Sequence, residues 1–373
     1  MKQKTGNKSN GSIPPLPLLP EEIILTILML LPARTLHKKM IYVCKQWYNI
    51  IRDPIFINKH LKRSRTCLLM KSHQLESKSV FIMEKGEKGF GFEEIRFPTT
   101  KIVHPTSCDG LILFNDKKRL INTLYVLNPV TRQHVSLPRL DWSQLEFGFS
   151  CCLTKSSVGG DYKVVCRWHV SCNLMIVTVG KSNAWRSIST KTLRSDDQKI
   201  LLTDMIAVDG FVHWVNWWKP LHVVTLEVDS ESLSRSPLPE ELKKDRCFFK
   251  TTGNFLSALT EQPCNGLLWD VWRFLDCKKG VWTKLYNIKF EPQRHMPHIV
   301  LGANKKIRLY PIGWVDNGDV LILACWLEET LKDSIAYNVK TGEATTIVMK
   351  STSYLFRKML SVHVNSLVNL LGI

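Results

Sequence analysis

Residues 124–138 read LYVLNPVTRQHVSLP: an apolar strand, a polar turn and a second strand that ends in Leu-Pro. The same order of features returns at 224–239 as VTLEVDSESLSRSPLP, at 271–282 as VWRFLDCKKGVW and at 335–347 as IAYNVKTGEATTI. A weaker copy, IVTVGKSNAW, covers 176–185. Each copy predicts a β-hairpin, because strand-forming runs on both sides of a turn signal are typical of two paired strands.

Strand-like runs bounded by turn residues also fill the rest of the chain after residue 65. The runs are Cys67–Lys71, Val80–Met83, Gly110–Phe114, Leu124–Leu127, Tyr162–Arg167, Leu174–Val179, Val212–Val215, Val223–Val228, Leu267–Val271, Val320–Ala324 and Ser334–Asn338. Successive turns of the repeated pattern lie about 50 to 60 residues apart, close to the period of some propeller blades. We therefore expect an all-β, propeller-like domain of about six irregular blades over 66–373, with each blade covering its neighbour's apolar face. An ordinary antiparallel sandwich is the alternative.

The chain before residue 65 has a different pattern. Residues 1–13 are polar and rich in Gly, Ser, Asn and Lys, which predicts a disordered tail. From Pro20, apolar residues follow helical spacing as far as Leu31, and Pro32 ends that helix. We assign 14–65 to one small helical module.

Two further short helices are expected in this module, one at 34–38 and one at about 39–51. Asp53 is suited to cap a further turn that reaches Leu61. Three short helices with this much apolar surface cannot bury all of it among themselves. The module therefore needs a partner, which is either the rest of the chain or another protein.

The overall composition is that of a globular protein, with 44% hydrophobic and 23% charged residues. The 51 basic and 33 acidic residues give a net charge of +18. A large basic excess is typical of nucleic-acid-binding proteins. Because the basic residues here are scattered, a solvated surface or a preference for acidic protein partners is favoured.

The cysteines and the N-terminus indicate the compartment. The eleven cysteines include no CxxC pair, and the apolar stretch near the N-terminus is interrupted by Pro20, Glu21 and Glu22, unlike a secretory signal. The uncharged run 23–33 is about half of the ~20 residues that span a bilayer. We therefore expect reduced thiols, a cytoplasmic and/or nuclear location and no membrane partner.

The N-terminal helices resemble an F-box. The resemblance is carried by LPEEII at 19–24, Ile27-Leu28, Leu31-Pro32, Leu36, VCKQW at 43–47 and Ile50-Ile51, followed by Asp53-Pro54, Phe56 and His60-Leu61. F-box domains bind a Skp-type adaptor, which connects them to a cullin and its RING subunit. The resemblance thus implies a substrate-recognition adaptor of a ubiquitin ligase, a non-catalytic subunit that recruits a protein target for ubiquitination.

Residues 66–373 resemble, more loosely, the kelch-like F-box-associated domain of plant F-box proteins. The carrying phrases are SCDGLI at 107–112, the turn NPVT at 128–131 with Leu137-Pro138, DYKVV at 161–165, WRS at 185–187, DGFVHW at 209–214 and Val271-Trp272. The family has Asn where Asp109 and Asp209 stand, a change that keeps the turn chemistry. The family's Gly-Tyr-Asp turn before Asp161 is degraded here to FSCC at 149–152.

A docking surface for the adaptor is expected on the helices, where aliphatic side chains supply contact area and the two prolines set the helix ends. The residues expected to form or support it are Leu19, Pro20, Ile23, Ile27, Leu31, Pro32, Leu36, Val43, Cys44, Lys45 and Trp47. Packing within the module is the alternative for each apolar residue. Lys45, with Lys38 or Lys39, is suited to face acidic residues of the adaptor.

The sequence offers little that indicates enzyme or metal chemistry, and we expect no cofactor. Gly180-Lys181-Ser182 lacks the earlier glycine of a phosphate-binding loop, and Gly86, Gly89 and Gly91 favour a loop between strands. Cys166, His169 and Cys172, with Cys151-Cys152, lack zinc-finger spacing and favour buried thiols. His213 is expected to pack in a core, because no motif supplies it with an acid or a nucleophile.

The target cannot be read from the sequence. Trp217, Trp218 and Trp272 are candidates for a target-binding surface, because tryptophan is enriched at binding hot spots. A place in the blade core is the other interpretation of these rings, and it is the favoured one. The alternative function is a basic nucleic-acid-binding propeller with a helical dimerisation segment; a kelch-like oxidase would need a metal or nucleophile set that the sequence does not offer.

Overall fold

The computed structural model describes residues 19–71, 79–86, 89–96, 102–118, 121–140, 149–168, 173–216, 222–243, 247–262, 267–296, 307–327, 330–347 and 360–370. The expected tail at 1–13 lies outside these residues. Helical elements lie at α1 (Glu21–Leu30), α2 (Ala33–Lys38), η1 (Met40–Tyr42), α3 (Lys45–Arg52), α4 (Pro54–Arg63), α5 (Ser195–Ile200), η3 (Glu240–Leu242), α6 (Pro292–His295) and η4 (Asp316–Gly318). No helix within these ranges is long and apolar enough to cross a membrane.

The strands form six antiparallel sheets of four strands each. Blade 1 consists of β24 (Leu360–Val364), β1 (Thr66–Lys71), β2 (Ser79–Gly86) and β3 (Gly89–Arg96). Blade 2 consists of β4 (Ile102–Cys108), β5 (Leu111–Lys118), β6 (Ile121–Leu127) and β7 (His134–Ser136). Blade 3 consists of β8 (Phe149–Lys155), β9 (Tyr162–Trp168), β10 (Leu174–Thr178) and β11 (Arg186–Ile188). Blade 4 consists of β12 (Ile206–Val208), β13 (Phe211–Val215), β14 (His222–Glu227) and β15 (Ser232–Pro237). Blade 5 consists of β16 (Cys247–Thr252), β17 (Phe255–Glu261), β18 (Leu268–Asp276) and β19 (Val281–Lys289). Blade 6 consists of β20 (Ile307–Val315), β21 (Val320–Leu327), β22 (Thr330–Asn338) and β23 (Ala344–Ile347).

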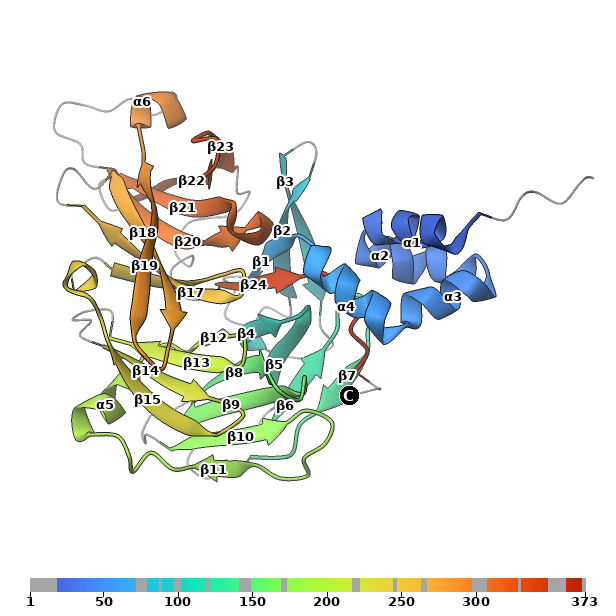
Figure 1. Ribbon diagram of the computed structural model, residues 1–373, viewed down its shortest axis with the longest axis horizontal. Coiled ribbons are helices and arrows are strands. Elements are labelled where there is room, and N and C mark those ends of the chain that lie inside the picture. Colours follow the sequence, from blue (N-terminus) through green and yellow to red (C-terminus); the bar gives the residue numbers. More distant parts are fainter. Residues whose placement is uncertain are drawn as a thin grey trace, which may run out of the picture.

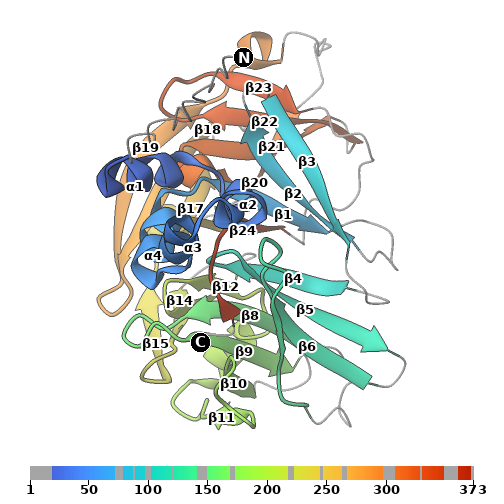
Figure 2. The same cartoon turned by 90° about the vertical axis from the view of Figure 1, so that its right-hand side faces the viewer.

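The sheets surround a common axis, as Figure 2 shows, with the helices in front of them. Neighbouring innermost strands contact one another in the order β24, β4, β8, β12, β16, β20 and back to β24. The ring closes in blade 1, where β24 from the end of the chain pairs with β1, so that Cys67 lies opposite His363. The predicted propeller of about six blades is therefore confirmed, and the sandwich alternative is wrong.

The repeated sequence pattern occurs at the same position in every blade that contains it. Its five turns connect the third strand to the fourth in blades 2 to 6. In three of them an Asn or Asp side chain accepts hydrogen bonds from backbone N–H groups two and three residues later: Asn128, Asp276 and Asn338. These bonds lie within the turn itself, which is why the pattern is readable in the sequence.

The apolar core lies between adjacent blades. Trp214, Trp269 and Trp314, from blades 4, 5 and 6, are fully buried there. Two Asp-Gly turns, at Asp109-Gly110 and Asp209-Gly210, have positive φ at both residues, as tight hairpins between first and second strands require. Asp at these positions therefore keeps the turn, as expected.

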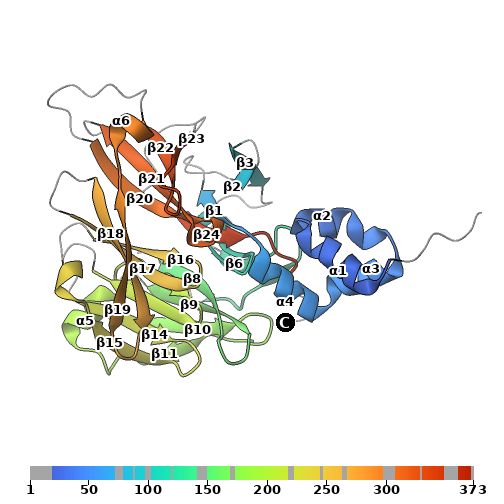
Figure 3. The same cartoon turned by 45° about the horizontal axis from the view of Figure 1, so that its top comes forward.

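The helical module stands at one side of the propeller, with α4 nearest to the blades (Figure 1), and a second view shows the same (Figure 3). Asp53 caps α4 as expected, because its carboxylate accepts hydrogen bonds from the N–H groups of Ile55 (2.8 Å) and Phe56 (2.9 Å). The expectation of one helix over 39–51 is wrong. The backbone of Cys44 is extended, so the chain divides into η1 and α3, and the break leaves Tyr42 and Val43 exposed.

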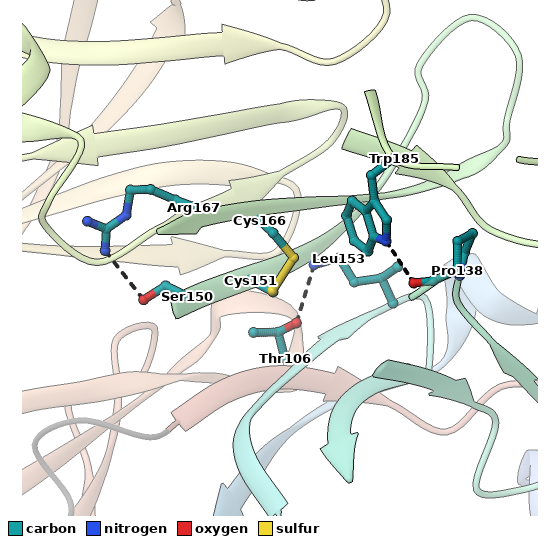
Figure 4. The surroundings of a disulfide bond; sticks show 8 residues. All are labelled: Thr106, Pro138, Ser150, Cys151, Leu153, Cys166, Arg167 and Trp185. Atoms are coloured by element: carbon teal, nitrogen blue, oxygen red, sulfur yellow. Dashed lines mark hydrogen bonds between the residues drawn. A yellow bond between two sulfur atoms is a disulfide. The ribbon is translucent and has the colours of Figure 1, made fainter. Parts of the chain in front are cut away.

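The expectation that the thiols are all reduced is also wrong, because Cys151 and Cys166 form a disulfide (Figure 4). The two residues lie directly opposite each other on β8 and β9, with their Cα atoms 4.2 Å apart. Directly opposed side chains in an antiparallel pair are close enough for such a bond, a relation that linear spacing does not reveal. Among the described residues, Cys44, Cys67, Cys108, Cys152, Cys277 and Cys325 are free thiols.

Candidate functional site

Helix α1 is apolar on two sides. Ile24 and Leu28, one helical turn apart, are buried in the module's core. An adjacent side of the helix, together with Leu19 just before it, leaves large aliphatic side chains exposed, although a helix of a single soluble domain normally turns such residues inward. The exposed fractions are 52% for Leu19, 48% for Ile23, 38% for Ile27 and 69% for Leu30.

Two prolines define the ends of this helix. Pro20 occupies the N-cap position, and Glu21 and Glu22 lie in the first turn, where the helix dipole favours acidic side chains. Leu31 has extended backbone angles (φ −85°, ψ 144°), because the residue before a proline is disfavoured in the helical region. The carbonyl of Leu31 accepts a hydrogen bond from Nε2 of His60 (2.8 Å), which ties α4 to this turn.

More apolar side chains are exposed on the rest of the module. They are Tyr42 (79%), Val43 (56%), Tyr48 (43%) and Ile55 (66%). We call these four, together with Leu19, Ile23, Ile27 and Leu30, the outer apolar residues. Lys38, Lys39 and Lys45 are exposed on the same module and make no ion pair with any residue that the structure describes.

The inner side of the module packs on the propeller. Its core cluster includes Val130, from a turn of blade 2, and Leu367, from the segment after β24. At the edge of this contact, Arg34 forms an ion pair with Glu93 and hydrogen bonds with Asn365. The helices are thus fixed against the blades by one side, while the outer apolar residues remain uncovered.

The structure places the predicted docking residues in three environments. Leu19, Pro20, Ile23, Ile27, Pro32, Val43, Cys44 and Lys45 are exposed; Leu31 and Trp47 are half-buried; Leu36 is fully buried. Leu36 can therefore only support a surface from behind. The prediction missed Leu30, Tyr42, Tyr48 and Ile55. Leu30 follows Ile27 by three residues, so helical spacing could have predicted that the two share a side of α1. The sequence contains no comparable signal for the break at Cys44, which leaves Tyr42 exposed.

The candidate target-binding residues are less informative. Trp217 and Trp218 lie outside the described residues. Trp272, on β18, is half-buried and packs against the cluster between blades 4 and 5. This contact favours a role in blade packing for Trp272.

The residues considered for catalysis or phosphate binding make structural contacts instead. His213 is buried between Phe211 and Phe274, and its Nδ1 lies 2.9 Å from Oγ1 of Thr225. Burial lowers the pKa of His213 to about 3, so the ring is neutral at physiological pH. Lys181 belongs to the turn after β10 and pairs with Asp161 (2.7 Å). Within the described ranges no three His, Cys, Asp or Glu residues are grouped as a metal site; His169 and Cys172 lie outside them.

Comparison with known proteins agrees with this architecture. A family model described as an F-box associated beta propeller domain matches residues 60–368, and an F-box-like model matches 16–63. The Arabidopsis thaliana F-box protein At5g49610 is 22% identical over 293 residues, covering 73% of this chain and 79% of its own length. The Arabidopsis F-box/LRR-repeat/kelch-repeat protein At2g27520 is 25% identical over 314 residues, covering 78% and 83%.

Solved structures are more distant. TolB from Acinetobacter baumannii aligns with a TM-score of 0.47 and 8% identity, covering 83% of this chain and 70% of that one. The match to the F-box associated family model, in contrast, spans most of the chain, including all six blades. The chain therefore belongs to the F-box-associated β-propeller family, with an F-box-like helical module before the propeller.

Proposed function

We propose that the chain is the substrate-recognition adaptor of a Skp–cullin–F-box ubiquitin ligase. The single observation that carries the proposal is the two-sided apolar character of α1, buried at Ile24 and Leu28 and open at Ile23 and Ile27. The open side is the place where a Skp-type adaptor would bind. Cullin and RING subunits would then be reached through that adaptor.

The outer apolar residues offer enough surface for a stable complex. Complete burial of an aliphatic side chain is worth about 1.5–3 kcal/mol, and each outer residue has more than a third of its surface still to bury. Exposed Lys38, Lys39 and Lys45 add charge complementarity to an acidic partner, which increases the rate of association. Apolar burial would supply most of the affinity.

The propeller is the proposed receptor for a protein target, which it would hold near a ubiquitin-conjugating enzyme. Such a subunit acts by proximity and orientation and makes no bond itself. The fixed contact through Val130 and Leu367 suits this role, because a rigid connection keeps the target at a constant distance. We place the boundary between module and propeller near residue 65, and the site of action in the cytoplasm and/or nucleus.

The net charge of +18 supports a second candidate, a nucleic-acid-binding propeller. The two proposals differ in the partner and in its salt dependence. Phosphate contacts give an affinity that falls steeply with salt, whereas docking on apolar residues changes little.

The test is isothermal titration of the purified chain with a Skp-type adaptor at two salt concentrations, and in parallel with a DNA duplex and a single-stranded RNA. Tight adaptor binding that varies little with salt is the expected result. Nucleic-acid binding with a steep salt dependence, and no adaptor binding, would replace the proposal by its alternative. Affinity purification from plant cells with the proteasome blocked would then identify the target.

A further inference from the structure

A cavity of about 780 Å³ lies on the propeller axis. Its walls come from the innermost strands of blades 1 to 5, and α4 contributes Asn58, Leu61 and Lys62 at one end. This volume lies within the range of small-molecule sites, roughly 300–1,000 Å³. The cavity is therefore large enough for a metabolite-sized ligand.

Most polar groups of the cavity wall already have partners. Lys155 pairs with Asp109 (3.2 Å), which also accepts a hydrogen bond from the hydroxyl of Tyr162 (3.0 Å). Oγ of Ser107 lies 2.7 Å from Nδ1 of His363. These interactions stabilise the contacts between blades.

Lys250, on β16, differs from them. Its side chain is half-buried in the cavity wall, and no carboxylate of the described chain lies within ion-pair distance of its ammonium group. Burial lowers the pKa of Lys250, and the more distant Asp204 only partly opposes that effect. An ammonium group that loses water without gaining a counter-charge destabilises the fold, and an anion in the cavity would remove this penalty.

The remaining charges of the cavity lie at its rim. Lys62 of α4 is exposed and unpaired among the described residues, and so are Asp204 and Asp209 on loops. An anion would therefore find its charge partner at Lys250, with Lys62 as a second cation on the α4 side. Asp204 and Asp209 would disfavour a ligand with large negative charge and favour one with a single acidic group or with an additional hydroxyl or amine.

We propose that this cavity binds a small molecule through a carboxylate or phosphate group held by the ammonium of Lys250. The ligand would contact the innermost strands of several blades and the end of α4 together. The cavity is separate from the outer apolar residues. Binding of a ligand in the cavity can therefore be tested independently of adaptor docking.

The experiment measures thermal unfolding and calorimetric binding of the full chain with lactate, which has one carboxylate and one hydroxyl, and with inorganic phosphate, each against sodium chloride of equal ionic strength. Lys250→Met is the test variant and Lys250→Gln a second one that keeps a polar wall. Lys279→Met, an exposed lysine in the turn after β18, is the matched control. Because Lys250 has no ion pair to lose, Lys250→Met should unfold at no lower temperature than the wild type without ligand.

The expected result is a saturable rise in melting temperature of the wild type and of Lys279→Met with at least one anion. Both Lys250 variants should bind that anion at least tenfold more weakly. The anion that binds distinguishes a carboxylate from a phosphate ligand. No saturable rise with either anion, or equal binding by the Lys250 variants, would overturn the proposal; neither result would affect adaptor docking.

Discussion

Replacement of the four outer apolar residues at α1 by alanine should abolish most of the adaptor affinity. Leu19, Ile23, Ile27 and Leu30 expose 52%, 48%, 38% and 69% of their surfaces. Together they leave about two complete side chains to be buried, which corresponds to about 3–6 kcal/mol of binding free energy. Alanine retains part of that surface, so the expected loss is about 2–4 kcal/mol, or about 30- to 1,000-fold in Kd.

The same substitutions should barely change folding, because exposed positions contribute little to stability and alanine favours the helix. The assay is isothermal titration with a Skp-type adaptor, combined with a melting curve for each variant. Val158→Ala with Leu202→Ala is the matched control, since both residues are exposed and apolar but belong to the propeller. A folded quadruple variant that binds with wild-type affinity would refute the reasoning.

Three further predictions concern the propeller. Because burial lowers the pKa of His213 to about 3, the unfolded chain takes up a proton first as the pH falls below ~6.5, and the free energy of unfolding should then decrease by up to ~1.4 kcal/mol per pH unit. Denaturant titrations at several pH values should show a shallower pH dependence for His213→Gln than for the wild type. Equal slopes for the two proteins would contradict the burial of His213. Gly110→Ala should lower the melting temperature strongly, because φ is +82° and a Cβ would lie 2.4 Å from the carbonyl oxygen of Val364. Gly91→Ala, with open space around it, should leave the melting temperature almost unchanged. Similar shifts for the two variants would count against the turn geometry. Reduction of the Cys151–Cys166 disulfide, which links residues 15 apart, should cost roughly 3 kcal/mol of unfolding free energy; free thiols at both positions in mass spectrometry of unreduced protein would exclude the bond.

The part of the fold that could be predicted from the sequence is the middle of each blade. Every strand predicted from an apolar run corresponds to a second or third strand, such as β5, β9 or β21, which neighbouring blades cover on both faces; among the strands in these positions, β17 of blade 5 was missed. The innermost strands carry polar residues into the axial cavity, as Lys250 does in β16, and the outermost strands face solvent. Their mixed composition gives no clear apolar signal, so the innermost strands were missed, and the outermost strands of blades 2 to 6 were predicted only as the second strands of the repeated hairpins.

Pairings between distant parts of the chain could not be predicted either. Cys67 and His363 lie opposite each other across almost the whole chain, and no local pattern encodes that register. The bond between Cys151 and Cys166 depends on the strand register of β8 and β9, which spacing alone leaves open. The side on which a helical residue lies was partly predictable, because Ile23 and Ile27 are four residues apart and share one side, while Ile24 and Leu28, shifted by one residue, share another. That Leu36 lies inside required the packing of the whole module.

Hydrogen exchange of the chain alone and of its complex with a Skp-type adaptor tests the central claim most directly. Helix α1 and the segment Tyr42–Tyr48 should exchange more slowly in the complex, while the blades should exchange at the same rate in both samples. Unchanged exchange in those helices at saturating adaptor, or slowing confined to the blades, would contradict the account.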